Sequence, residues 1–236
     1  MKVLNTEKED YHVHSMNFSD GFNTIDEIVI FAGRIGMKKL VFADHSRAAM
    51  EAEGIPRKTF RIIIHDHRWQ NVHNDVEVIF GVEADLLNEQ GDICDEIDRH
   101  KSDFVILSYH RNVYKGDKNK ITQAFINAIE KHHEKINIIG HVFLPVLDGS
   151  DIDIAKIVEL ANKYKIPLEM NAKYLFISSN SKMKEESLKK KTIDAIKLML
   201  SKADSIYVNS DAHTLYELKE LRKLGFKFLK ENGYVK

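Results

Sequence analysis

The sequence predicts an α/β fold, a TIM-like barrel of seven strand–helix pairs formed by a single domain over residues 1–236. Short β-rich runs alternate with longer helical patterns, which indicates βαβ units and a mainly parallel sheet. The chain has only three prolines and eleven glycines, none clustered into a linker. Seven such pairs in this length fit a closed barrel better than an open sheet. The predicted strands are Asp10–Ser15, Lys39–His45, Glu77–Ala84, Phe104–His110, Asn137–Phe143, Pro167–Ala172 and Ser205–His213.

The helices predicted between these strands are marked by capping residues and by amphipathic spacing. Thr24 can cap the first helix, with Glu27 completing a capping box and Gly36 placed to end it. An apolar stripe at helical spacing runs from Ile154 to Ala161. The predicted helices are Thr24–Gly36, Pro56–Asn74, Cys94–His100, Ile121–His133, Asp153–Lys165, Glu185–Ser201 and Leu215–Gly225.

Composition and charge are those of an ordinary globular chain. Hydrophobic residues make up 43% and charged residues 30%, which allows a full core. The net charge of -1 leaves no overall basic field of the kind found in non-specific nucleic-acid binders. No secretory signal or membrane-spanning run is evident, so we expect a cytoplasmic protein without a membrane partner. Cys94, the only cysteine, can form no internal disulfide and is expected to be structural.

Histidines gather at the ends of the predicted strands. Side chains at i and i+2 of a strand point the same way, so His12 pairs with His14, and Asp211 pairs with His213. The C-terminal ends of barrel strands meet at one mouth, so these histidines should converge. Six of the twelve histidines share this position: His12, His14, His45, His110, His141 and His213.

This set of side chains indicates a metal site. A lone histidine at a strand end is more often a satisfied polar residue, but six of them with two such pairs favour metal binding. Asp20, Glu83 and Asp211 add carboxylates, and a buried Glu83 would be costly unless paired or metal-bound. Imidazole and carboxylate without thiolates favour catalytic Zn, Mn or Fe. The other histidines lie in predicted helices or at their ends and receive no ligand role: His65, His67, His73, His100, His132 and His133.

The order of these residues resembles the PHP (polymerase and histidinol phosphatase) family. Each motif is weak alone, but six of them in order on successive strands, spanning residues 12 to 213, make a specific match. The motifs are Tyr11-His12-Val13-His14-Ser15 with Ser19-Asp20-Gly21 behind it, Phe42-Ala43-Asp44-His45, Gly81-Val82-Glu83, Ser108-Tyr109-His110, Gly140-His141 and Ser210-Asp211-Ala212-His213.

The resemblance implies a distorted seven-stranded (β/α) barrel that holds two to three divalent metal ions, Zn, Mn or Fe. The motifs assign three ligand sets, with Glu83 as a bridge between the first two. Asp20 is the ligand whose position varies in the family, and a turn residue is its alternative interpretation. The sets are His12, His14, Glu83 and Asp211 for the first metal, Glu83, His110 and His141 for the second, and Asp20, His45 and His213 for the third.

The implied chemistry is hydrolysis of a phosphate ester by a metal-activated hydroxide, with in-line attack on phosphorus. Glu83, Asp211 and His213 are the candidate catalytic residues. The leaving group would be stabilised by the third metal or protonated by an acid, either His213 or a metal-bound water. A phosphate-binding site usually also contains a positively charged side chain. The loops at the mouth offer three such side chains, although each could instead be an ordinary solvated surface charge. The candidates are Arg47, Arg111 and Lys173, while Asp44 and Asn171 are expected to orient ligands.

Several functions fit these residues. A small phosphorylated metabolite is the favoured substrate, histidinol phosphate being one known in the family. A nuclease or phosphodiesterase acting on nucleic acid or nucleotides is the main alternative. An amidohydrolase lacks its expected carbamylated lysine here, and a non-enzymatic binding module would not need the full ligand set. Two basic segments are interpreted as solvated: Arg57, Lys58, Arg61 and Arg68 with Phe60 and Trp69 nearby, and the lysine-rich helix start Lys182–Lys191. The oligomeric state is left open.

Overall fold

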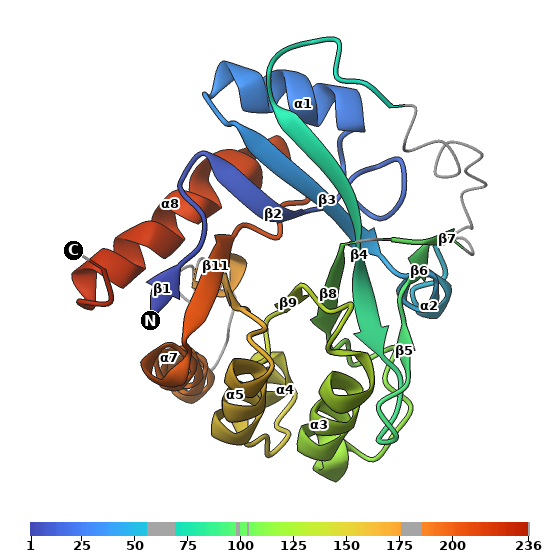
Figure 1. Ribbon diagram of the computed structural model, residues 1–236, viewed down its shortest axis with the longest axis vertical. Coiled ribbons are helices and arrows are strands. Elements are labelled where there is room, and N and C mark those ends of the chain that lie inside the picture. The colour runs from blue at the N-terminus through green and yellow to red at the C-terminus, as the bar shows by residue number, and fades with distance from the viewer. Residues whose placement is uncertain (56–68, 98–99, 103, 176–185, 236) are drawn as a thin grey trace.

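The computed structural model describes residues 1–55, 69–97, 100–102, 104–175 and 186–235. Its centre is a row of seven parallel strands whose order in space is their order along the chain (Figure 1). The short strand β1 (Lys2–Val3) adds to the outer side of the last of them. The predicted α/β fold is confirmed, and each predicted strand is present at least in part. The seven are β2 (Glu9–Val13), β3 (Lys39–His45), β4 (Glu77–Leu86), β8 (Val105–Ser108), β9 (Ile138–Ile139), β10 (Leu168–Asn171) and β11 (Ser205–Asn209).

The first and last strands of this row meet at a seam. One isolated parallel bridge, Val13 to Ala212, joins their ends in place of a continuous ladder. Side chains complete the contact: the backbone N–H of Tyr11 donates to Asn209 Oδ1 at 3.1 Å, and Ser210 Oγ donates to Asp10 Oδ2 at 2.5 Å. The sheet therefore curls into a TIM-like barrel whose seam is held mostly by side chains.

Apolar side chains fill the barrel. Tyr11 lies on β2 and Phe104 just before β8, and two strands separate β2 from β8 in the row, yet the two rings are 6.1 Å apart. Their contact therefore crosses the interior. Tyr207 of β11 joins them with its ring 4.4 Å from that of Tyr11, and Ala43, Ile106 and Ile138 pack in the same cluster. This packing leaves the other end of the barrel for polar residues.

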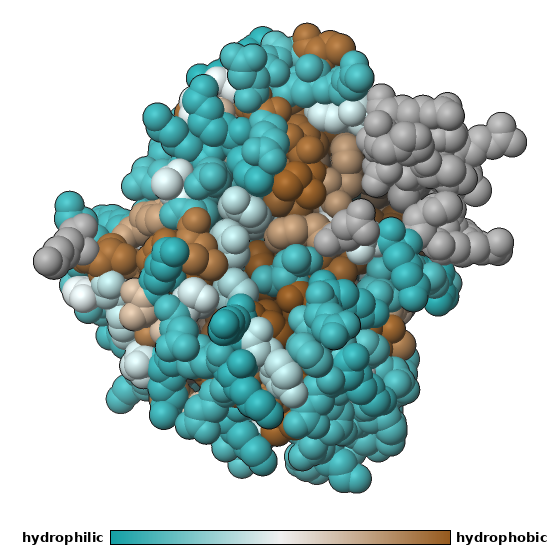
Figure 2. Space-filling view, viewed as in Figure 1, coloured by the Kyte–Doolittle hydropathy of each residue, from teal (hydrophilic) through white to brown (hydrophobic). Residues whose placement is uncertain are grey.

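Helices surround the sheet in the order expected for successive strand–helix units (Figure 1). The capping box of Thr24 and Glu27 at the start of the first helix is confirmed. Hydrophilic residues cover most of the surface over α3 and α5 (Figure 2), while residues such as Phe125 and Ile157 are buried against the sheet. No helix in the described ranges is long and apolar enough to cross a membrane. The main helices are α1 (Ile25–Arg34), α3 (Ile121–His132), α5 (Ile154–Lys163), α7 (Glu186–Lys202) and α8 (Leu215–Glu231).

The predicted helix Cys94–His100 is wrong, because none of the described residues of this segment is helical and most of them are extended. β4 continues to Leu86, and the chain turns back at Gly91, whose φ of 78° lies in the left-handed region that favours glycine. The returning strand β5 (Ile93–Cys94) then pairs antiparallel with β4, placing Cys94 opposite Asp85. A second short pair follows, formed by β6 (Glu96–Ile97) and β7 (His100–Lys101). Pairing with β4 has overridden the local helical pattern.

Other boundaries also differ from the prediction. The predicted helix Pro56–Asn74 lies outside the described residues up to residue 68, and residues 69–74 are not helical, because Asn71 Oδ1 accepts the backbone N–H groups of His73 and Asn74 in a turn. The predicted strand Asn137–Phe143 ends at Ile139, where the chain turns toward a short helix. The sequence reading missed α2 (Arg47–Ala52), which Ser46 caps, and also α4 (Leu144–Leu147) and the 3₁₀ turn η2 (Lys118–Lys120).

Gly225 does not end the last helix as predicted, because α8 continues to Glu231. The glycine instead allows α8 to lie close against the sheet. A Cβ atom at this position would stand 2.5 Å from Val208 Cγ1 and 3.2 Å from Ala172 Cβ. Close packing, not the backbone conformation, therefore accounts for this glycine.

Gly225→Ala is expected to destabilise the protein by about 1–3 kcal/mol, because the added methyl group overpacks the contact with Val208. Urea unfolding measures the free energy of unfolding. Val208→Ala introduced together with Gly225→Ala should recover part of the loss, since it removes the atom that the new methyl group meets. A single variant as stable as the wild type would contradict this interpretation.

Candidate metal centre

Glu83 lies at the centre of the converging histidines. This residue, near the end of β4, is only 1% exposed, and its two carboxylate oxygens face ring nitrogens brought by four other strands or the turns after them. The ring nitrogens lie at 3.5 Å (His12 Nε2), 3.7 Å (His14 Nε2) and 3.0 Å (His45 Nδ1) from Oε2, and at 3.5 Å (His110 Nε2) and 2.8 Å (His141 Nε2) from Oε1.

A second part of the cluster forms around Asp20 in the loop after β2. Its Oδ1 lies 3.2 Å from His213 Nε2 and 3.6 Å from His45 Nε2. Asp211 connects the two parts, because its Oδ1 is 3.3 Å from His14 Nε2. All nine predicted ligand residues thus lie in one cluster at the C-terminal ends of the strands, where barrel sites are built.

The geometry can be compared with the three predicted ligand sets. Three groups of side chains each place one possible ligand atom within 4.8 Å of the others. They overlap the predicted sets but differ from them in two ways. His14 also belongs with Asp20 and His45 also belongs with Glu83, while the predicted ligands Asp211 and His141 are in none of the three groups. The ligand assignments themselves stay predictions. The groups are His14, Asp20, His45 and His213; His12, His14 and Glu83; and His45, Glu83 and His110.

The cluster has the chemistry of a cation site. The Nε2 atoms of His12 and His14 face each other at 3.1 Å, an arrangement that a shared cation would satisfy. Asp20 Oδ1 and His45 Nδ1 are buried without a hydrogen-bond partner among the described residues. His45 Nδ1 is close to Glu83 but off the hydrogen-bond direction. Nitrogen and oxygen ligands without thiolates fit Zn, Mn or Fe.

Electrostatics keep the carboxylates of this cluster ionised. Burial raises the pKa of Glu83, but the histidines around it, His110 and His12 first, hold it well below the ordinary value. Burial likewise raises the pKa of Asp211, and Lys173 with His14 lowers it further than burial raises it. For His14, burial and the neighbouring His213 and His45 lower the pKa well below 6.5, which favours the neutral imidazole. Burial also lowers the pKa of His12, His45 and His110, but the neighbouring carboxylates raise it above the ordinary value, so these rings must lose a proton to bind metal.

Asp211 has an unusual backbone conformation. Its φ of 52° lies in the left-handed region, which aspartate enters more readily than most residues other than glycine. Asn171 Nδ2 donates to Asp211 Oδ2 at 3.0 Å and fixes the side chain. The next residue, Ala212, makes the bridge to β2 at the barrel seam. Backbone strain is commonly found at functional sites, and here it turns a carboxylate toward His14.

Two carboxylates behind the histidines were missed by the sequence reasoning. Asp85 Oδ1 lies 2.6 Å from His110 Nδ1, and Glu169 Oε1 lies 2.7 Å from His12 Nδ1. Both acids are buried. The spacing Glu83-Ala84-Asp85 puts Asp85 on the same face of β4 as Glu83, a signal that could have identified it.

Among the two other residues expected to orient ligands, Asn171 does contact Asp211. Asp44 contacts no predicted ligand by a hydrogen bond. It accepts hydrogen bonds from the backbone N–H and Oγ of Ser15 and from Ser19 Oγ. Asp44 therefore stabilises the loop that follows His14, and reaches that ring only through Ser19, whose Oγ is 3.3 Å from His14 Nδ1.

The three predicted phosphate-binding cations differ in their positions. Lys173 Nζ lies 3.3 Å from Asp211 Oδ1 and 3.1 Å from His213 Nδ1, so it adjoins the cluster. Arg47 forms ion pairs with Glu51 and Glu96 at the rim. Arg111 is mostly exposed and lies 3.7 Å from Asp148. Of these three cations, Lys173 is the one that contacts predicted ligands among the described residues.

Of the remaining residues singled out in the sequence, those that the structure describes have their partners outside the cluster. His73 pairs with Asp26 on the surface, and His133 stacks on Tyr164. Cys94 is buried and unpaired, as a structural residue would be. Trp69 packs edge-on against Phe80 at 5.6 Å and belongs to an apolar cluster. Outside the described residues lie His65, His67, Arg57, Lys58, Phe60, Arg61, Arg68 and residues 182–185, while residues 186–191 are helical as expected.

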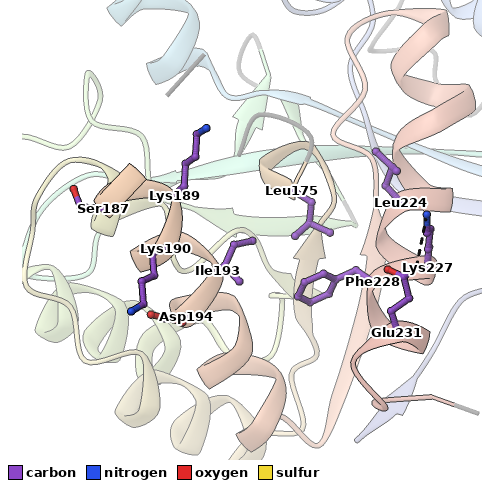
Figure 3. A pocket seen from close by; sticks show the side chains of 10 residues that line it. All are labelled: Leu175, Ser187, Lys189, Lys190, Ile193, Asp194, Leu224, Lys227, Phe228 and Glu231. Carbon is purple, nitrogen blue, oxygen red and sulfur yellow. Dashed lines mark ion pairs between the residues drawn. The ribbon is translucent and has the colours of Figure 1, made fainter. Parts of the chain in front are cut away.

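A hollow of about 710 Å³ lies between α7 and α8 (Figure 3). Leu175, Ile193, Leu224 and Phe228 point toward one another across it. Lys227, paired with Glu231, lies at its side. It contains none of the predicted ligands, so its size is no argument for placing the active site there.

The comparisons with known proteins place the chain in a family. Residues 10–180 match the PHP domain, and the chain belongs to the PHP domain family. Asp211 and His213 lie beyond the matched range. A protein of Serratia proteamaculans named probable phosphatase is 28% identical over 69% of this chain and 63% of its own length, so the chain spans less than two thirds of that relative. A Shewanella piezotolerans protein of the same name is 27% identical over 91% of this chain and 81% of its own.

A solved structure has the same fold. It is a histidinol phosphate phosphatase from Lactococcus lactis, complexed with zinc, L-histidinol and phosphate. Its TM-score is 0.53 at 17% sequence identity, and the match covers 94% of this chain and 93% of that one. At this identity the likeness concerns the fold alone, and it agrees with the barrel described above.

Proposed function

We propose that this chain is a metal-dependent phosphatase that hydrolyses a small-molecule phosphomonoester, in the manner of histidinol phosphatases. Membership of the PHP domain family and likeness to proteins named probable phosphatases support a hydrolase acting on phosphate esters. The observation that carries the proposal is the convergence of five histidines on the buried carboxylate of Glu83. Such a concentration of ligand groups at a barrel mouth is typical of a catalytic metal centre.

The residues of the cluster would hold two to three divalent cations, with Glu83 between the first two sets. Zn, Mn and Fe all suit these ligands, and when bound such ions supply a hydroxide at neutral pH and neutralise phosphate charge. Asp20, His45 and His213 would form the third set beside the first. The zinc in the Lactococcus lactis structure makes zinc the first ion to test.

Other side chains would position the ester. The ammonium group of Lys173 lies next to Asp211 and His213. Burial lowers the pKa of Lys173, but Asp211 and Glu217 raise it above the ordinary value, so the side chain stays positively charged. It would hold a phosphate oxygen at the edge of the centre. The leaving alkoxide would be stabilised by the cation that Asp20, His45 and His213 would hold, and its protonation by His213 or by a bound water is the alternative. Arg47 and Arg111 at the rim complete the proposed phosphate contacts.

The decisive experiment combines metal analysis with hydrolysis of an aryl phosphomonoester and an aryl phosphodiester. We expect two to three metal ions per chain and monoester cleavage that a chelator abolishes and added metal restores. A protein that contains metal but cleaves neither ester would contradict the proposed reaction. One that takes up no metal would contradict the metal centre.

The same assay decides the alternative of a nuclease or phosphodiesterase. A clear preference for the diester would favour it. The four basic side chains that could support a nucleic-acid strand, Arg57, Lys58, Arg61 and Arg68, lie outside the described residues, and Trp69 near them is packed on Phe80. The described contacts therefore give this alternative no support.

A further inference from the structure

The strongest unused feature of the centre is a buried carboxylate beneath it. Glu169 lies on β10 and is 0% exposed. Its Oε1 accepts hydrogen bonds from His12 Nδ1 at 2.7 Å and from Asn209 Nδ2 at 2.9 Å. Its Oε2 accepts from the backbone N–H of His141 at 3.1 Å and from Asn171 Nδ2 at 3.2 Å. Four N–H donors thus surround one carboxylate.

This pattern shows that Glu169 is not placed to bind a metal itself. A carboxylate offers about four lone-pair directions, and the four donors occupy them. Glu169 therefore acts by holding its four hydrogen-bond donors in place.

The contacts of Glu169 join strands that the sheet keeps apart. β11 lies beside β10 in the row and meets β2 across the seam, so the hydrogen bond from β10 to His12 of β2 passes over β11 at the end of the barrel. The hydrogen bond from the backbone of His141 to Glu169 fixes the turn after β9. Asn171, which donates to Glu169, also donates to Asp211 and so links the two carboxylates. Three predicted ligands from three places in the chain thus depend on one side chain.

The contacts of Glu169 determine which ring nitrogens of His12 and His141 face the metal centre. A proton held on His12 Nδ1 by Glu169 leaves Nε2 as the atom that faces Glu83 and His14. Fixing the backbone at His141 sets where its ring falls, with Nε2 2.8 Å from Glu83. Carboxylates that accept from the far nitrogen of a ligating histidine fix its tautomer and raise its basicity.

We infer that Glu169 is a positioning residue of the metal centre, which orients His12 and His141 so that their Nε2 atoms converge on the site of the bound cations. The inference rests on the proposed metal-dependent function. Asp85, which accepts from His110 Nδ1 at 2.6 Å and from Ser46 Oγ, supports the third histidine in the same way.

Glu169→Gln tests this role with little change of shape. The amide has one oxygen and one NH₂ group, so in either orientation an N–H donor opposes another N–H donor, on the side of His12 or on the side of His141. We expect zinc affinity to fall about 10–100-fold. Titration of the metal-free protein against a chromophoric chelator measures this affinity without any turnover, and circular dichroism follows the fold.

Asp95→Asn is the matched control, because Asp95 is also buried but its side-chain hydrogen bond is with Lys135, which is no part of the metal centre. It should change zinc affinity less than threefold. Should Glu169→Gln fail to fold, Glu169→Asp keeps the charge and both acceptors but shortens the side chain, and its zinc affinity is expected to fall at least threefold.

Three outcomes would overturn the inference. Folded position-169 variants with zinc affinity within threefold of the wild type would do so, leaving the proposed function intact. An equal loss in Asp95→Asn would show that any buried carboxylate has this effect. A wild-type chain that binds no zinc, manganese or iron would overturn the proposed function, and the inference with it.

Discussion

Glutamine in place of Glu83 is expected to lower kcat/KM for an aryl phosphomonoester by about 10³-fold or more, the loss typical of a main electrostatic contributor. Glu83 faces five histidine nitrogens within 3.7 Å and is proposed to bridge two cations. A neutral amide of the same shape cannot balance the positive charge of those cations. Metal content should fall at the same time, which parallel metal analysis and steady-state kinetics would detect.

The control for this substitution lies on the same strand. Glu77, at the exposed start of β4, forms an ion pair with Lys39 at 2.8 Å, and Glu77→Gln should leave activity and metal content unchanged. Circular dichroism would establish that both variants are folded. Full activity of Glu83→Gln with a full complement of metal would refute the bridging role.

The second large effect concerns the barrel seam. Arg222 of α8 is 3% exposed, and its Nη1 lies 3.0 Å from Oδ2 of the fully buried Asp10. Arg222→Ala would leave that carboxylate buried without its partner. We expect the free energy of unfolding to fall by about 3–5 kcal/mol, as measured by urea unfolding.

A neighbouring residue and a double variant provide the controls. Lys223 is exposed and pairs loosely with Glu220 at 3.7 Å, so Lys223→Ala should cost less than about 0.5 kcal/mol. Arg222→Met combined with Asp10→Asn removes both charges and should be clearly more stable than Arg222→Ala. A loss no larger in Arg222→Ala than in Lys223→Ala would show that the buried pair is unimportant.

The loss in Arg222→Ala should also depend on pH. Burial raises the pKa of Asp10, and Arg222 opposes the rise, so removal of the arginine raises the folded-state pKa further. A carboxyl group with a raised folded-state pKa costs stability above that pKa, and the cost disappears as the pH falls to the pKa of the unfolded chain. The variant should therefore approach the wild type in stability as the pH is lowered. A deficit that grows with falling pH would contradict this account.

Much of the fold could be predicted from local pattern. All seven strands of the barrel follow β-rich runs in the sequence, and Lys39–His45 has the same bounds in both. The helix capped by Thr24 was predictable because a capping box depends on residues only three apart. The segment Cys94–His100 was not, since its extended form depends on pairing with β4, whose length the pattern did not reveal.

The candidate ligands were accessible for a similar reason. A barrel brings every strand end to one mouth, so polar residues at strand ends converge whatever lies between them. His12 and Glu83 could therefore be grouped without knowledge of their distance. Glu169 could not be recognised in this way, because its role depends on a contact with His12, which is 157 positions away in the sequence and lies across the end of the barrel.

The sequence by itself determined the repeated strand–helix pattern, the PHP motifs and the concentration of histidines and carboxylates at the strand ends. Only the tertiary structure decided how the seam closes, why α8 needs Gly225, and which buried acids support the histidines. The physical reason is range: periodicity and capping act between residues a few positions apart. Contacts between non-neighbouring strands are instead set by the curvature and register of the whole sheet.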